Sequence, residues 1–140
     1  RIETAPDGYG HILDYKTGKA PSQKVVDSGF SPQLTLTAAI LAHGGFDAIG
    51  ALKPGELTYL EVTGRKPAGR EEVRANPGDE SQAAADRALA GLKALVAQFF
   101  EPTRAYASRT APQFVRDRHG DYDHLARVFE WSTSGEEGEE

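Results

Sequence analysis

The chain contains no cysteine and no long apolar run. Without cysteine, disulfide bonds, thiolate metal sites and cysteine nucleophiles are excluded. The apolar stretches fall short of the roughly 20 residues that span a bilayer, and the opening RIETAPDGYG has no hydrophobic signal region. With 140 residues, of which 39% are hydrophobic, the chain is long enough to form one domain with a core. We therefore expect a soluble globular domain of the cytoplasm.

The chain also lacks the basic excess that is typical of free-standing nucleic-acid-binding proteins. Its net charge is −5, but four of the glutamates belong to the terminal SGEEGEE, and the remainder is near neutral at about −1. Lys16, Lys19 and Lys24 form a local basic group within this near-neutral body. A solvated surface is the simpler interpretation of these lysines, and contact of Lys19 and Lys24 with DNA is the functional one.

Turn residues predict a hairpin at the start of the chain. The sequence PDG at residues 6–8 suits a tight turn, because proline fits its first central position and glycine tolerates positive φ. Residues 1–5 are then expected to pair with residues 9–16. A short helical turn is expected before Gly29.

Residues that commonly begin and end helices predict a helix within SPQLTLTAAILAHGG. Ser31 is the expected N-cap, Pro32 the first helical residue and Gly44 the C-cap. Apolar residues occupy nearly the whole circumference of this helix, so we expect it to be largely buried.

The second half of the chain alternates between ordered and irregular segments. The sequence ELTYLEVTG predicts a strand with Leu57, Tyr59 and Glu61 on one face, and residues 64–78 read as an exposed loop. A long helix is expected over residues 79–102, ended by its proline. Its capping box is Asp79 with Gln82, and its expected buried stripe is Leu92, Leu95, Val96 and Phe99.

The order of these elements predicts an α/β (α+β) fold with a small mixed central sheet flanked by helices. A short helix capped by Asp121 is expected within residues 121–131, packed through Leu125, Val128 and Phe129. Residues 1–131 are therefore the predicted folded domain, and residues 132–140 the predicted acidic, disordered tail.

The candidate catalytic and metal-binding residues lie in HILDYKTGK, residues 11–19. Asp14 and Lys16 lie two positions apart, so both point to the same face of a strand. The Asp14 carboxylate and the Tyr15 carbonyl can bind Mg²⁺ or Mn²⁺, and Lys16 can orient water or stabilise charge on a phosphate. Together these groups suit phosphodiester hydrolysis. An exposed ion pair on an edge strand is the simpler alternative.

The downstream context resembles a known family. ILDYKTGK followed by the helix opening SPQL resembles the RecB-like branch of the PD-(D/E)XK nuclease superfamily, which has a restriction-endonuclease-like fold. DYKTGKAPSQKVVDSGFSPQLTLTAAIL together with GDYDHLARVFEW resembles the C-terminal nuclease domain of AddB proteins. The resemblance implies that Asp14 is the metal-binding acid, Lys16 the catalytic lysine and Gln33 a glutamine beside the site.

The same resemblance implies cofactors and partners. It implies Mg²⁺ or Mn²⁺ as cofactor, the end of single-stranded DNA as substrate, an AddA-type helicase subunit as partner, and a role in double-strand break repair. Some AddB proteins hold an iron–sulfur cluster on four cysteines, and no such cluster is expected here because cysteine is absent.

The chain departs from the family pattern at its start. The family's first acid would lie one residue before Arg1, and its upstream helix has no counterpart, so the chain is expected to be a fragment that is inactive alone. Glu3 lies on the opposite face from that acid and is a weak substitute. Thr37 stands where some relatives have tyrosine.

Two other functions stay open. A DNA- or subunit-binding module with a degenerate site is the alternative function, and an unrelated domain with a chance D-x-K is a third.

A second polar cluster, RDRHGDYDH, has the density of a metal site. Its candidate ligands are Asp117, His119, Asp121, Asp123 and His124. A polar loop with Asp121 as a helix N-cap is the simpler interpretation. We expect His43 to be structural, and His11 to be a poor catalytic partner because it faces away from Asp14.

Overall fold

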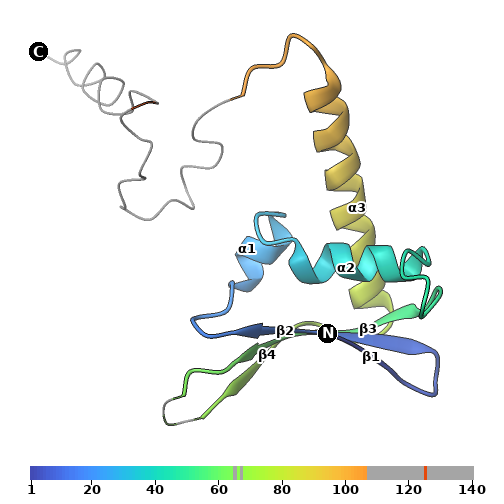
Figure 1. Cartoon of the computed structure of the whole chain (residues 1–140), viewed down its shortest axis with the longest axis vertical. Coiled ribbons are helices and arrows are strands. Elements are labelled where there is room, and N and C mark those ends of the chain that lie inside the picture. Colours follow the sequence, from blue (N-terminus) through green and yellow to red (C-terminus); the bar gives the residue numbers. More distant parts are fainter. Residues whose placement is uncertain (65, 67, 107–124, 126–140) are drawn as a thin grey trace, which may run out of the picture. The chain divides into compact units, whose positions relative to one another are not determined.

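The computed structural model describes residues 1–64, 66, 68–106 and 125. The chain divides into two compact units, residues 1–101 and 102–140, and the described helices and strands lie in the first. In chain order they are β1 (Ile2–Thr4), β2 (Tyr9–Lys16), α1 (Gln23–Asp27), α2 (Gln33–Ala42), β3 (Lys53–Glu61), β4 (Arg70–Ala75) and α3 (Asp79–Phe100) (Figure 1).

The strands form one mixed sheet in the order β1-β2-β3-β4. The β1–β2 and β3–β4 pairs are antiparallel, and the central β2–β3 pair is parallel. A parallel pair needs a long crossover, which α1 and α2 supply. The helices of the first unit lie on one face of the sheet (Figure 1). This arrangement confirms the predicted mixed sheet of an α/β, restriction-endonuclease-like fold.

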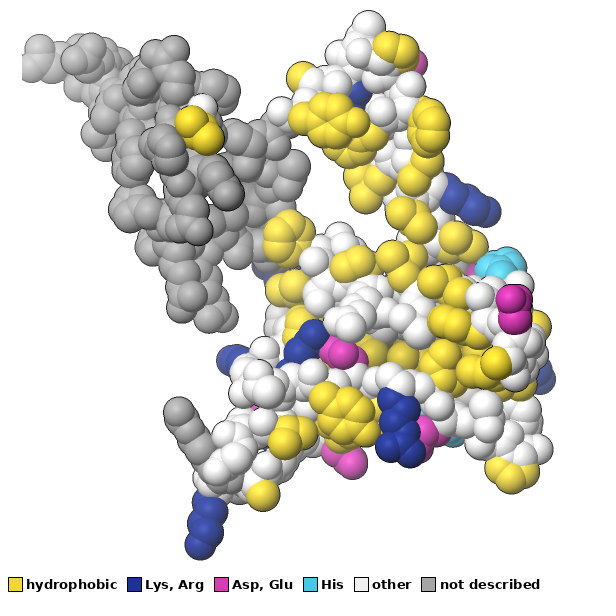
Figure 2. All heavy atoms as spheres, in the orientation of Figure 1, with side chains coloured by type: hydrophobic (Ala, Val, Ile, Leu, Met, Phe, Trp, Pro, Cys, Tyr) yellow, Lys and Arg dark blue, Asp and Glu magenta, His cyan; other side chains and the backbone are white. Residues whose placement is uncertain are grey.

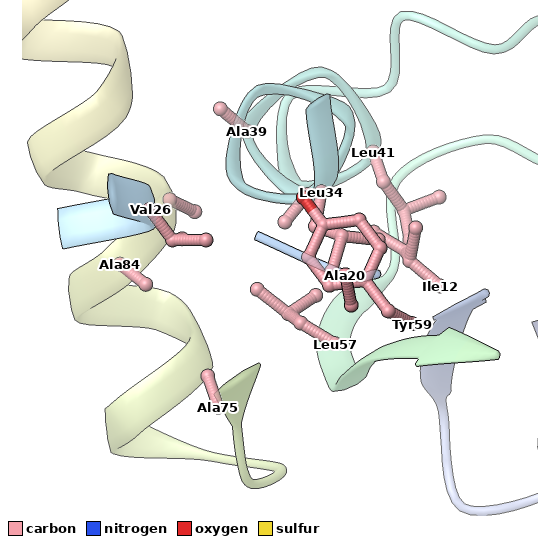
Figure 3. Packing of buried hydrophobic residues seen from close by; sticks show 12 residues of the cluster. Ile12, Ala20, Val26, Leu34, Ala39, Leu41, Leu57, Tyr59, Ala75 and Ala84 are labelled. Atoms are coloured by element: carbon pink, nitrogen blue, oxygen red, sulfur yellow. The ribbon is translucent and has the colours of Figure 1, made fainter. Parts of the chain in front are cut away.

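The core lies between α2 and the central strands. Ile12 from β2, Leu57 and Tyr59 from β3, and Leu34 and Leu41 from α2 are at most 3% exposed (Figure 3). Burial of such side chains contributes about 1.5–3 kcal/mol each. The core therefore holds α2 directly over β2 and β3, with the first turn of the helix above the ends of these strands.

Two small residues permit this close packing. A Cβ atom on Gly10 would lie 2.5 Å from Leu41 Cδ2, so glycine lets α2 approach the start of β2. Ser81 in the first turn of α3 is fully buried, and its hydroxyl donates to the Pro54 carbonyl at 2.7 Å. Ala84 and Ala85 continue this contact, which attaches the start of α3 to the sheet.

The predicted hairpin is confirmed. Ala5 donates its N–H to the Tyr9 carbonyl at 2.8 Å, and Gly8 turns the chain with a φ of 85°. The strand over Leu57, Tyr59 and Glu61 is also confirmed, with those three side chains buried on one face of β3.

The helix predicted over residues 31–44 exists, but its N-cap prediction is wrong. Pro32 occupies the N-cap position of α2, and the Ser31 hydroxyl instead lies 3.4 Å from the Tyr59 hydroxyl. The predicted C-cap is displaced by one residue: His43 is the C-cap, and Gly44 follows it with a positive φ of 70°, which ends the helix. The helix is not buried on every side as its apolar sequence predicts, because Ile40 is 46% exposed.

Two further predictions are wrong. Residues 70–75 form β4 rather than loop, because pairing with β3 compensates for their weak strand pattern. The α3 capping box does not form: Gly78 is the N-cap, and Glu80 instead accepts hydrogen bonds from the Asn76 backbone and side-chain nitrogens at 3.0 and 2.7 Å.

The predicted buried stripe of α3 is largely exposed in the described unit. Leu92, Leu95 and Val96 are 42–53% exposed, and Figure 2 shows apolar side chains gathered along this helix. The buried residues lie in its first half instead, because only those turns reach the sheet. The predicted helix at 121–131, apart from its Leu125, and the predicted tail lie outside the described residues. Among the described residues, no helix combines the length and apolar content needed to cross a bilayer.

Candidate functional site

The structure brings Asp14, Lys16 and Gln33 together. The pleat of β2 places Asp14 and Lys16 on the face that carries the helices, at the carboxyl end of the strand. Gln33 is the first residue of α2, which begins above this edge. The three side chains therefore come from two elements that are separated by α1 and a loop.

The three side chains form a closed triangle. Lys16 Nζ lies 2.7 Å from Asp14 Oδ2 and donates to Gln33 Oε1 at 3.0 Å. Gln33 Nε2 donates to Asp14 Oδ1 at 3.0 Å. The Gln33 amide thus contacts both the acid and the base and holds them in one geometry. An isolated surface ion pair would lack this third member.

Tyr59 forms the support beneath the triangle. It pairs in register with Asp14 on the neighbouring strand, and its side chain is fully buried. Lys16 Nζ lies 5.4 Å from the centroid of its ring, and Arg74 Cζ lies 5.8 Å from it. Both are within the range of a cation–π contact. The ring therefore stabilises the Lys16 ammonium from the side of the core.

One carboxylate oxygen at the site has an unusual environment. Asp14 Oδ2 is shielded from solvent and accepts no hydrogen bond of normal geometry, so its short contact with Lys16 is electrostatic. A buried oxygen without a hydrogen bond has unused ligating capacity. Asp14 is therefore a chemically suitable ligand for a hard divalent cation.

The Tyr15 carbonyl is a second available oxygen. Leu13 exchanges both backbone hydrogen bonds with Arg1, so the backbone groups of Leu13 point toward β1. Tyr15, two residues further along β2, points its carbonyl in the same direction, past the paired residues of β1. Mg²⁺ is commonly held by one or two carboxylates and keeps several waters. One carboxylate and one carbonyl fit part of such a shell. No group of three or more His, Cys, Asp or Glu side chains suited to a metal ion occurs among the described residues.

A second charged group lies beside the triangle, and sequence reasoning did not identify it. Glu61 is in register with Lys16, is buried, and accepts the Ala20 N–H at 2.7 Å. Arg70 reaches Glu61 at 3.5 Å and Glu72 at 2.8 Å. The one available signal was the position of Glu61 on the apolar face of its strand, where a lone acid needs a partner.

The other predicted residues occupy separate places. Lys19 lies in the loop after β2, whereas Lys24 is exposed on α1. Glu3 is opposite His11 in the sheet and pairs with Arg1 at 2.9 Å. It therefore faces away from Asp14, as expected.

The remaining sequence candidates have structural surroundings or are not described. His11 Nδ1 accepts the Glu56 N–H at 3.0 Å, so this side chain has a structural partner in β3. The Thr37 hydroxyl donates to the Gln33 carbonyl at 2.7 Å. The cluster of Asp117, His119, Asp121, Asp123 and His124 lies outside the described residues.

Comparison with known proteins finds a matching family and short similarities to much longer proteins. The PD-(D/E)XK nuclease superfamily matches residues 1–112. An uncharacterized protein of Rickettsia felis is 43% identical over 47 residues, which are 34% of this chain and 6% of that protein. An uncharacterized protein of Rickettsia typhi is 43% identical over 64 residues, 44% of this chain and 7% of that protein. The chain thus spans less than a tenth of the length of these relatives. No solved structure matches it significantly.

Proposed function

Because this chain belongs to the PD-(D/E)XK nuclease superfamily, we propose that it is the metal-dependent DNA nuclease domain of a longer protein. The observation that carries the proposal is the Asp14–Lys16–Gln33 triangle at the carboxyl edge of the sheet. An acid, a base and an amide that contacts both are the groups that phosphodiester hydrolysis requires in one place.

The proposed roles follow from the chemistry of each group. Asp14 and the Tyr15 carbonyl hold Mg²⁺ or Mn²⁺, which, when bound, polarises the phosphate and makes water a better nucleophile. Lys16 orients the attacking water or stabilises negative charge on the phosphate oxygens. Gln33 keeps Asp14 and Lys16 in register, supported by its 3.0 Å contacts to both.

The parent protein, in this proposal, is an AddB-type subunit of a cytoplasmic helicase-nuclease. The resemblance of DYKTGKAPSQKVVDSGFSPQLTLTAAIL and GDYDHLARVFEW to AddB supports it. Relatives many times longer than this chain are compatible with such a subunit. An AddA-type helicase would then present single-stranded DNA to the site as an exonuclease substrate during double-strand break repair.

The strand register suggests how the metal shell is completed. Arg1 pairs with Leu13 and Ile2 with Ile12, so a residue one position before Arg1 would lie opposite Asp14. Side chains of directly opposed residues share one face of the sheet, with Cβ atoms about 4.5–5.5 Å apart. An aspartate at that position would be a second carboxylate for the same ion.

The test compares two chains extended by one residue, with Asp or with Asn before Arg1. The Asp-extended chain should bind Mn²⁺ about tenfold or more tightly than the Asn-extended chain in calorimetry, because affinity follows ligand charge. The Asp-extended chain should also cut end-labelled single-stranded DNA. Equal Mn²⁺ affinities with no cleavage by either chain would contradict the proposal.

The second candidate function is a non-catalytic module that binds DNA or the partner subunit through a degenerate site. The observation that favours it is the single carboxylate at the triangle, with no three-ligand group among the described residues. It predicts that both extended chains bind single-stranded DNA while neither binds Mn²⁺ measurably.

A further inference from the structure

A basic hollow lies next to the triangle, and the proposed chemistry leaves it without a role. Its volume is about 570 Å³. Its lining comes from residues 17–19, which follow β2 directly, from Lys66 in the β3–β4 connection, and from Arg70 at the start of β4. Because Lys16 is the last residue of β2, this lining begins one peptide bond beyond the triangle.

The two lysines of the hollow have no partner among the described residues. Lys19 and Lys66 are exposed and make no ion pair or hydrogen bond with the residues that the structure describes. Arg70, by contrast, is paired with Glu61 and Glu72. The positive charge left uncompensated at the hollow therefore belongs to the two lysines, which come from separate segments of the chain.

The loop that carries Lys19 is anchored to the base of the hollow. Glu61, which is buried and lines the hollow, accepts the neighbouring Ala20 N–H at 2.7 Å. This bond ties the loop to the end of β3 and fixes the backbone beside Lys19. The space beside Gly18, which also lines the hollow, is empty of protein: a Cβ atom built there would have no heavy atom within 4 Å. The Lys19 side of the hollow is thus held by the fold.

We propose that this hollow binds the phosphodiester backbone of the DNA strand, at a phosphate next to the one that is cut. Two lysines that line one hollow, and that are unpaired within the part of the chain that the structure describes, suit a phosphate, whose charge they would neutralise. The carboxyl ends of parallel strands are also where ligands bind in open α/β sheets. The proposal rests on the proposed function and assigns Lys66, which the sequence did not indicate, to substrate binding.

Binding of single-stranded DNA by the full chain in metal-free buffer tests this assignment. We would measure the anisotropy of a labelled oligothymidine from about 50 to about 200 mM salt for wild type, Lys19→Ala, Lys66→Ala and the control Lys53→Ala. Lys53 is exposed at the start of β3, at the opposite end of the sheet, and its substitution makes the same charge change.

Each hollow variant should bind about two- to fivefold more weakly, the range of one exposed ion pair. The slope of log affinity against log salt should fall by about 0.7 for each lost phosphate contact. Lys53→Ala should match wild type. Glu61→Gln, which removes a negative charge but keeps an acceptor for the Ala20 N–H, should bind more tightly.

Hollow variants that behave like Lys53→Ala, or a wild-type chain that does not bind the oligonucleotide, would overturn the assignment. Because no metal is present, this outcome is independent of catalysis. Failure of the nuclease proposal would instead appear as absent Mn²⁺ binding and cleavage in the extended chains, with the lysine effects on DNA binding intact.

Discussion

The two ends of the β2–β3 pair lie under the same helix but carry different chemistry. At the amino end, Gly10 and Leu41 pack closely, and an added Cβ atom would collide with the leucine. At the carboxyl end, Asp14 and Lys16 meet Gln33, and the residues that directly follow β2 line a hollow. One end therefore fixes α2 against the sheet, so that the other can hold charged groups in a defined geometry.

The largest expected effect comes from removing the charge at the carboxyl end. In the Asp-extended chain, Asp14→Asn should reduce DNA cleavage about a thousandfold and abolish measurable Mn²⁺ binding, because the ligand charge is lost while the side-chain shape is kept. Asp47→Asn, at an exposed loop position, is the matched control and should leave both unchanged. If Asp47→Asn lost as much cleavage and Mn²⁺ binding as Asp14→Asn, the loss could not be assigned to the Asp14 site.

Truncation in the core between the two ends should be the next largest effect. Leu57 is fully buried, and Leu57→Ala should lower the free energy of unfolding by about 2–5 kcal/mol through lost burial and a cavity. Urea denaturation measures this change. Truncation of the exposed Leu95 provides the contrast, with a change of about 0.5 kcal/mol or less in the described unit. A similar loss at both positions would show that Leu95 is buried in solution.

The amino end can be tested with a pair of glycines on the same chain segment. Gly10→Ala should cost about 1–3 kcal/mol of stability, because its Cβ atom would lie 2.5 Å from Leu41 Cδ2. Gly18→Ala, at the open carboxyl end, should be nearly neutral because nothing lies within 4 Å of its Cβ atom. Thermal unfolding of the two variants measures the difference. If both were neutral, the amino end would not be closely packed.

The smallest expected effect concerns the N-terminus of α3. Hydrogen bonds from the Asn76 backbone N–H and then its side chain hold the pKa of Glu80 below its ordinary value of 4.5. A lowered folded-state pKa means that the stabilisation is complete above the ordinary value and is lost as pH falls through the lower, folded-state value. Glu80→Gln should therefore weaken the acid-side pH dependence of thermal unfolding. An unchanged profile would contradict the assignment.

The candidate site was more predictable from sequence than its surroundings. Period-two alternation is sufficient to place Asp14 and Lys16 on one face, and the family pattern singled out Gln33. Glu61, Arg70 and Lys66 were missed because their proximity depends on how β3 and β4 pair. That pairing joins weakly patterned residues and leaves little trace in local sequence.

Local rules also failed where tertiary contacts compete for the same groups. Ser31 was expected to cap α2, but its hydroxyl lies beside the Tyr59 hydroxyl. The apolar stripe of α3 was expected to be buried, yet the described sheet reaches only the first turns of that helix.

The sequence by itself determined the hairpin, the helix boundary at Gly44, the face shared by Asp14 and Lys16, and the resemblance to a nuclease family. These depend on turn geometry, strand alternation and residue identity, which are local properties of the chain. Tertiary structure alone decided that Gln33 closes the triangle, that Tyr59 supports it, and that two distant lysines line one hollow. Such contacts depend on which strands pair and how closely a helix packs on them, and those outcomes belong to the whole fold.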